Sequence, residues 1–186
     1  MKVLLLSLLL ACLPTTGYAK HKETPALGKD TYQCAEVTGE LGIVTTCWDA
    51  TVHPEPDYER NHRLVELTLL LLGGNMHPPI EVYYSSFKDF EERLEHILPD
   101  MAIAQQNDAL LVFAHCREVF RGEQPVVIIE AYQQLDDRTF IHEFLHAALD
   151  AKAPHPNLFD NHIVLEEVVR RILTSSSYKE MVRSND

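Results

Sequence analysis

Two histidines and a glutamate stand close together in the segment His142-Glu143-Phe144-Leu145-His146. Side chains four residues apart in an α-helix lie one turn apart on the same face, so His142 and His146 could present two imidazole nitrogens to one tetrahedral metal ion. Glu143 lies about 100° from His142 around the same helix, where its carboxylate could reach a water molecule at that metal without being a ligand. The spacing therefore predicts a zinc site with Glu143 as a general base.

The residues around this motif favour a functional site over a solvated surface helix. Glu143 is the only charged residue between Arg138 and Asp150. An ordinary exposed helix carries more charge than this. The face opposite the histidines is apolar and consists of Ile141, Leu145, Ala148 and Leu149. We expect this face to pack on a sheet while the histidines face a cleft; the simpler alternative is a pair of surface or core histidines that bind no metal.

A catalytic zinc site usually has three protein ligands and an open fourth position. Glu166 is the preferred third ligand, because it borders the apolar stripe of the next predicted helix, whereas Glu167 points away from that stripe. Asp150 is a rival, since it lies one turn beyond His146; we favour for it a hydrogen bond to a ligand histidine. Two solvated helix acids would be the simpler interpretation of Glu166 and Glu167.

Three further side chains could stabilise the negative charge that develops on a carbonyl oxygen during hydrolysis. His155 and His162 lie in and just after the connection between the two helices, and His162 shares a helical face with Glu166. Tyr178 follows the last predicted helix. Exposed loop or cap residues would explain each of the three equally well.

Hydrophobic periodicity and capping signals predict the elements that position these residues. Asp136 or Asp137 should cap a helix that runs from Arg138 to about Ala151, and a last helix should cover residues 161–175. Upstream, the pattern predicts a β-rich segment, a helix, a strand, a helix and two strands over residues 41–48, 57–72, 80–84, 86–98, 110–116 and 126–129. This order predicts an α+β fold with helices packed on a small sheet.

The N-terminus has the composition of an export signal. Residues 1–19 contain Lys2, an apolar stretch over residues 3–13 and small residues before a predicted cut after Ala19. A competing interpretation is a short lipobox that ends in Cys12, in which case this cysteine would carry a lipid anchor. Both interpretations predict an exported protein, periplasmic or secreted, or else anchored to a membrane through its lipid.

An irregular lead-in over residues 20–31 and a single domain over residues 32–186 complete the predicted organisation. The chain has a formal net charge of −12, which argues against nucleic acid or an anionic membrane surface as the main partner. No segment after the signal is long and uncharged enough to span a membrane.

An oxidising compartment would allow Cys34 and Cys47 to form a disulfide. Cys116 is then left over from this disulfide pairing. Its apolar surroundings in the sequence predict a buried, unreactive thiol.

The motif at His142–His146, followed by Leu165-Glu166-Glu167-Val168-Val169, resembles the gluzincin, or thermolysin-like, branch of the zincin metallopeptidases. The resemblance covers roughly residues 126–175. It implies a small sheet whose edge strand binds the peptide substrate, and by that analogy residues 126–132 form the edge strand. The chain departs from the family in that no asparagine precedes Glu166, and Arg170 stands where an acidic residue is often found. Leu149 and Lys152 occupy the positions of the extra glycine and histidine of the metzincin branch, which excludes that branch.

Taken together, the residues and the resemblance predict an exported zinc metallopeptidase that acts on peptide or protein substrates. A catalytically silent zinc-binding or protein-interaction domain on the same scaffold is the first alternative, and the intact Glu143 argues against it. An interaction domain with an accidental motif is the second. It predicts that the purified protein contains no stoichiometric zinc.

Overall fold

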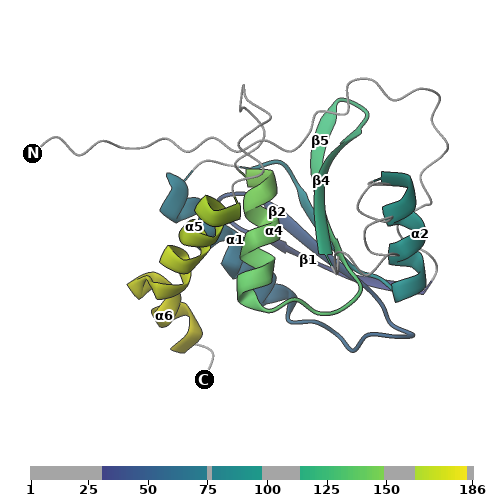
Figure 1. Ribbon diagram of the computed structural model, residues 1–186, viewed down its shortest axis with the longest axis horizontal. Coiled ribbons are helices and arrows are strands. Elements are labelled where there is room, and N and C mark those ends of the chain that lie inside the picture. Colours follow the sequence, from purple (N-terminus) through teal and green to yellow (C-terminus); the bar gives the residue numbers. More distant parts are fainter. Residues whose placement is uncertain (1–30, 75–76, 98–113, 149–161, 184–186) are drawn as a thin grey trace, which may run out of the picture.

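The computed structural model describes residues 31–74, 77–97, 114–148 and 162–183. Within these ranges the chain forms one mixed five-stranded sheet with helices on both faces (Figure 1). The five helices and five strands of these ranges make an α+β fold, which confirms the predicted fold class at that level. None of the described helices is long and apolar enough to cross a membrane.

Two antiparallel hairpins lie on either side of a central parallel strand. The sheet order is β1-β2-β3-β5-β4. β1 is antiparallel to β2 and β4 to β5, while β3 runs parallel to both β2 and β5. The strands are Tyr32–Thr38 (β1), Ile43–Asp49 (β2), Ile80–Tyr84 (β3), Ala114–Arg121 (β4) and Gln124–Ala131 (β5).

The predicted strand near residues 126–129 is confirmed as β5, but its place in the sheet differs from the expectation. β5 pairs with β3 on one side and with β4 on the other. The expectation that residues 126–132 form an edge strand is therefore wrong. β4 lies at the end of the described sheet, and the motif helix α4 (Asp137–Ala148) packs against it.

β4 also has different bounds from those predicted for it. The prediction covered residues 110–116, of which 110–113 lie outside the described residues, and the strand continues to Arg121. Beyond Cys116 the sequence lacks the continuous apolar run that indicated a strand, because this part of β4 includes exposed polar positions such as Glu118 and Arg121. Gly122 then takes a φ of 67°, which a glycine adopts easily, and the chain turns back into β5.

The predicted disulfide is present in the first hairpin. Cys34 on β1 lies directly opposite Cys47 on β2, with the Cα atoms 4.1 Å apart and the sulfur atoms bonded at 2.12 Å. Cys116, on β4, is partly buried and packs against the main core.

Capping residues fix the first two helices where the sequence predicted them. Asp57 accepts a hydrogen bond from the backbone of Arg60 at 2.8 Å, and α1 (Tyr58–Leu72) ends at Gly73, where φ is 120°. Ser86 accepts a hydrogen bond from the backbone of Asp89 at 3.2 Å and so caps α2 (Phe87–Ile97). These two helices lie on opposite faces of the sheet (Figure 1).

The remaining helices follow one another at the C-terminal end. Asp136 caps α4 by accepting a hydrogen bond from the backbone of Thr139 at 2.7 Å. Further on come α5 (His162–Thr174) and α6 (Ser176–Arg183). α6 was not predicted: the last predicted helix ended at about residue 175, and no side chain of α6 is fully buried. Its signal is Ser175, whose hydroxyl accepts a hydrogen bond from the backbone of Tyr178 at 3.1 Å.

One apolar core lies between the sheet and the helices α1, α4 and α5. The residues that α4 contributes to it are Phe140, Ile141, Phe144 and Leu145. Burying a side chain of this size stabilises the fold by about 1.5–3 kcal/mol. The orientation of α4 is therefore fixed, and its opposite side presents the motif residues His142, Glu143 and His146, all only partly buried.

Candidate functional site

Three of the predicted site residues come together between α4 and α5. His142 Nε2 and His146 Nε2 are 3.1 Å apart. On the other side of the same ring, His142 Nδ1 is 2.9 Å from Glu166 Oε1. The pairing of α4 with α5 rests on the buried Leu165 and Val169, which belong to the same core as the apolar face of α4.

The two histidine nitrogens have the separation that a zinc ion requires. With Zn–N bonds of about 2.0–2.1 Å and tetrahedral angles, two nitrogen ligands lie about 3.3–3.4 Å apart. The distance of 3.1 Å between the Nε2 atoms of His142 and His146 is close to that value. This distance is compatible with a shared zinc ion, and zinc binding by the histidine pair stays a prediction.

Glu166 does not join the two histidine nitrogens on the same side of the ring. Its carboxylate contacts His142 Nδ1, which points away from the Nε2 side where His146 lies. Among the residues that the structure describes, no group of three or more His, Cys, Asp or Glu side chains is arranged to hold a metal ion. Two side chains thus fit as ligands, and the predicted role of Glu166 as the third is not supported by this geometry.

Arg138 binds the other oxygen of Glu166. Its guanidinium donates to Glu166 Oε2 from Nη2 at 2.6 Å and from Nε at 3.2 Å. This hydrogen bond lowers the pKa of the Glu166 carboxyl below its usual value. The sequence analysis did not identify Arg138 as a site residue, although it precedes His142 by four residues and so lies on the same face of α4.

Glu143 differs from an exposed glutamate in the pKa of its carboxyl group. Burial raises the pKa of its carboxyl from 4.5 to about 7. A base is most effective when its pKa lies near the working pH, because it is then both available and strong enough to accept a proton. Glu143 follows His142 directly on α4, so the carboxylate and the histidine pair are held by one rigid element.

The first turn of α4 is held by contacts from two other helices. Arg60 of α1 binds both oxygens of Asp137, at 2.7 and 2.8 Å, and the Tyr178 hydroxyl of α6 donates to Asp137 Oδ2 at 2.6 Å. Burial and the neighbouring Asp137 carboxylate raise the pKa of Tyr178, so its hydroxyl stays protonated. Tyr178, a predicted oxyanion residue, thus has its hydroxyl committed to the start of the helix.

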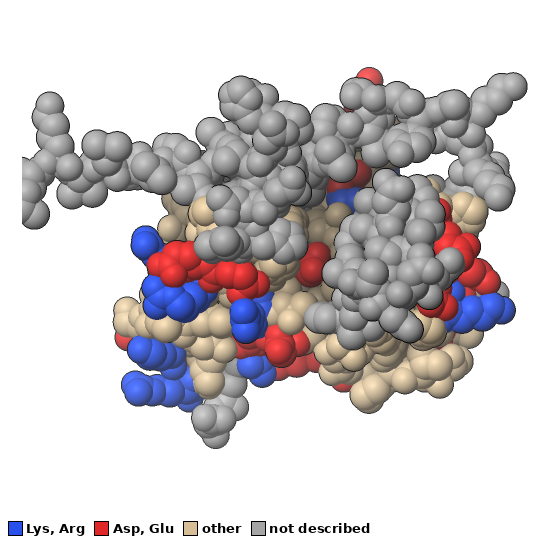
Figure 2. Space-filling view, viewed as in Figure 1, with Lys and Arg blue, Asp and Glu red and all other residues tan. Residues whose placement is uncertain are grey.

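The other predicted residues are distributed as follows. Glu167 points away from the histidines, as expected, and pairs with Arg170 and Arg171 at 2.7 and 2.8 Å. Asp150 and His155 lie outside the described residues, as does the side chain of His162 at the start of α5. Basic and acidic side chains are intermixed around this region of the surface (Figure 2).

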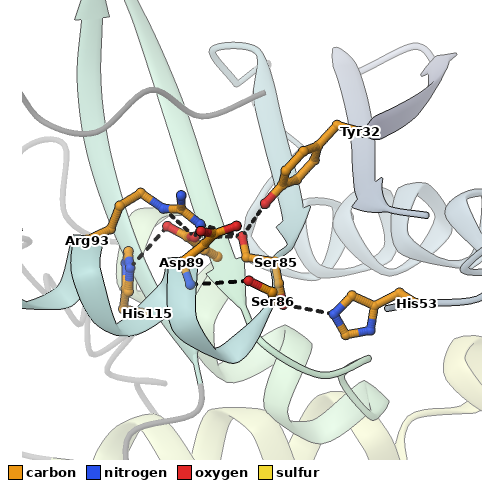
Figure 3. A network of polar contacts seen from close by, with 8 residues as sticks. Tyr32, His53, Ser85, Ser86, Asp89, Arg93 and His115 are labelled. Atoms are coloured by element: carbon orange, nitrogen blue, oxygen red, sulfur yellow. Dashed lines mark hydrogen bonds and ion pairs between the residues drawn. The ribbon is translucent and has the colours of Figure 1, made fainter. Parts of the chain in front are cut away.

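A second polar cluster lies on the opposite face of the sheet, under α2 (Figure 3). Arg93 donates to Glu130 Oε1 from Nε at 2.6 Å and also binds it through Nη2. Ser85 receives hydrogen bonds from Arg93 at 2.6 Å and from Tyr32 at 2.7 Å, and donates to Glu130 at 2.7 Å. His115 Nε2 lies 3.5 Å from Glu130 Oε2.

The members of this cluster have little contact with solvent. The exposed fractions are 0% for Ser85 and Glu130, 1% for Arg93 and 3% for His115. A buried pair of opposite charges needs hydrogen bonds of this kind to offset the loss of hydration. We therefore interpret the cluster as the attachment of α2 to the sheet.

Comparisons with protein-family models, with curated proteins and with solved structures give no match for this chain.

Proposed function

We propose that the protein is an exported zinc-dependent peptidase whose active site is formed by α4. The observation that carries this proposal is the histidine pair, whose Nε2 atoms lie 3.1 Å apart, with a glutamate between them in the chain whose pKa is raised by burial to about 7. The α+β architecture of the described residues is compatible with this proposal, and the zincin-like domain stays part of what is proposed.

Each residue of the motif has a defined task in this proposal. Zinc, when bound, supplies a Lewis acid that acidifies water and polarises a carbonyl group. His142 and His146 bind the ion through their Nε2 atoms. Glu143 accepts the proton of the attacking water and returns it to the nitrogen of the leaving amine. The pKa of about 7 suits Glu143 to both steps.

The substrate in this proposal is an extended peptide. β4 is an end strand among the described ones and packs beside α4, so its outer edge is the place where a peptide could add to the sheet by backbone hydrogen bonds. Glu118 and Phe120 are exposed on this strand and share its face with Cys116, which packs on the α4 side of the sheet. This face would contact the substrate side chains.

Export is part of the proposal. The disulfide between Cys34 and Cys47 is compatible with an oxidising compartment. The export signal at residues 1–19 and the possible lipid anchor at Cys12 lie outside the described residues and stay predictions.

The test compares the purified protein with its Glu143→Gln variant and, as a control, with Glu167→Gln on α5. We expect about one zinc per chain in all three by mass spectrometry. Cleavage of a mixed peptide library should be abolished by a chelator, should fall by about 10²–10⁴-fold in Glu143→Gln and should persist in Glu167→Gln.

Two outcomes would overturn this function. A protein without bound zinc would make the motif incidental. Zinc in all three proteins, but no cleavage by any of them, would instead indicate the alternative function of a silent zinc-binding domain on the same scaffold.

A further inference from the structure

Resting on the proposed zinc site, we propose that Glu166 acts from outside the coordination sphere. Together with Arg138 it forms a relay, defined as Arg138–Glu166–His142, that orients the imidazole of His142 so that Nε2 faces the metal position. Arg138 and Glu166 are then positioning residues, and neither is a ligand.

The first argument concerns the two nitrogens of the His142 ring. A neutral imidazole carries one proton, and the hydrogen bond made by one nitrogen decides which nitrogen is left to bind a metal. Glu166 Oε1, at 2.9 Å from Nδ1, accepts a hydrogen bond from that nitrogen, which keeps the proton on Nδ1. The lone pair is then on Nε2, which is the atom that faces His146 at 3.1 Å. The carboxylate thus selects the tautomer that the histidine pair needs.

The second argument concerns the carboxylate itself. Both of its oxygens are engaged, Oε1 with His142 and Oε2 with the guanidinium of Arg138. To become a ligand on the Nε2 side of the ring, Glu166 would have to leave both partners. Carboxylates that hydrogen-bond to the outer nitrogen of a ligand histidine are a general means of fixing a metal site.

The third argument is that the sequence spacing aligns all members of the relay. Arg138 and His142 are four residues apart on α4 and therefore lie on the same face, opposite Glu166 of α5. The His142 side chain is only 15% exposed, so its ring has few alternative orientations. The neighbouring Glu167 has the same chemistry but binds Arg170 and Arg171 instead, which makes it a matched control.

The relay and the ligand interpretation predict opposite signs for one variant. If Glu166 belongs to the relay, Arg138→Met removes the side chain that fixes the Glu166 carboxylate and lowers zinc affinity. The expected decrease is about 10–100-fold, the usual effect of removing a group that hydrogen-bonds to a ligand histidine. If Glu166 is a ligand, Arg138 competes with the metal for the same carboxylate, and Arg138→Met should tighten zinc binding. Arg171→Met is the control and should leave the affinity unchanged.

Two substitutions of Glu166 test the same point independently. A glutamine can still accept a hydrogen bond from Nδ1–H but is a poor zinc ligand, so in the relay Glu166→Gln retains most of the zinc affinity that Glu166→Ala loses. Equal losses in both variants would overturn the relay. Zinc affinity is measured by competition with a chromophoric chelator, and circular dichroism establishes that each variant is folded.

A measurement on the metal-free protein separates this inference from the proposed function. Long-range ¹⁵N–¹H NMR correlations report which nitrogen of His142 carries the proton. We expect the proton on Nδ1 in the parent and in Glu167→Gln, and a mixture of tautomers in Glu166→Ala. A proton on Nε2 in the parent would overturn the relay. If the tautomer is as expected but the parent neither binds zinc nor cleaves peptides, the proposed function fails while the relay stands.

Discussion

At the scale of single residues, two nearby carboxyl groups have pKa values shifted in opposite directions. Burial raises the pKa of Glu143 to about 7, whereas the Arg138 hydrogen bond lowers that of Glu166. A partly buried acid with a raised pKa costs stability once it ionises. Such a cost at one position is common where a group is needed for chemistry.

This cost can be measured in the metal-free protein. Because the folded-state pKa of Glu143 is above the unfolded value of 4.5, the stability that its neutral carboxyl contributes is fully present below pH 4.5 and is lost as the pH rises through about 7. Glu143→Gln cannot ionise, so with a chelator present it should be more stable than the parent at pH 8 by about 1–3 kcal/mol. Denaturant unfolding at pH 8 and at pH 4.5 checks this, and an equal difference at both pH values would contradict it.

At the scale of elements, the N-terminus of α4 is the point where three helices meet. Asp137 is nearly buried and receives hydrogen bonds from Arg60 of α1 and Tyr178 of α6. These contacts link the end of the chain to the start of the helix that carries both histidines. α6 has no fully buried side chain; its Tyr178 and Met181 pack partly buried against the main core, and the Tyr178 hydroxyl adds the hydrogen bond to Asp137.

Removing this hydroxyl should destabilise the protein modestly. Tyr178→Phe loses one hydrogen bond to a charged acceptor, and we expect a decrease of about 1–2 kcal/mol in the free energy of unfolding. The exposed Lys179→Ala is the control on the same helix. Hydrogen exchange should be faster in α6 and in the first turn of α4. Unchanged exchange in α4 would show that the contact does not support the motif helix.

The sequence predicted those elements whose ends carry local signals. Asp57, Gly73 and Ser86 mark the bounds of α1 and α2, and each acts through backbone groups a few residues away. The sequence singled out Glu166 as a site residue because its helix has a clear apolar stripe. Contacts between segments far apart in the sequence were not predictable. The inner position of β5 and the role of Arg138 depend on segments distant in sequence, and no local pattern encodes them.

At the scale of the whole molecule, the two faces of the sheet have different chemistry. The motif helix lies over an apolar core, while α2 is attached through the buried Arg93–Glu130 pair. Burial would by itself raise the pKa of Glu130, but hydrogen bonds and charge from His115 and Arg93 outweigh it and lower the pKa to about 2. The stability that the Glu130 pair contributes should therefore respond to acid.

Acid unfolding should report on this pair. Since the pKa of Glu130 is lowered in the folded state, its contribution is present above pH 4.5 and is lost as the pH falls towards 2. Over this interval we expect the free energy of unfolding to fall by about 2–3 kcal/mol more in the parent than in a Glu130→Gln variant. Exposed Glu36→Gln is the control. Parallel pH profiles for the parent and Glu130→Gln would contradict this assignment.

The disulfide between Cys34 and Cys47 also contributes to the stability of the whole molecule. It closes the β1–β2 hairpin between residues 13 apart in sequence. We expect the free energy of unfolding of the double variant Cys34→Ala/Cys47→Ala to be lower by about 2–4 kcal/mol. Reductant should lower the melting temperature of the parent to that of the double variant and leave the variant unaffected. A parent that is insensitive to reductant would show that the bond adds no stability.

The contact between Tyr178 and Asp137 also determines what proteolysis near residue 175 would remove from the structure. Chain ends are where trimming by other proteases begins. A cut anywhere between Ser175 and Tyr178 would remove the hydroxyl from the first turn of α4 and leave the sheet intact. Such a cut would leave Arg60 bound to both oxygens of Asp137, so the histidine-bearing helix would keep its tie to α1 and lose its tie to α6.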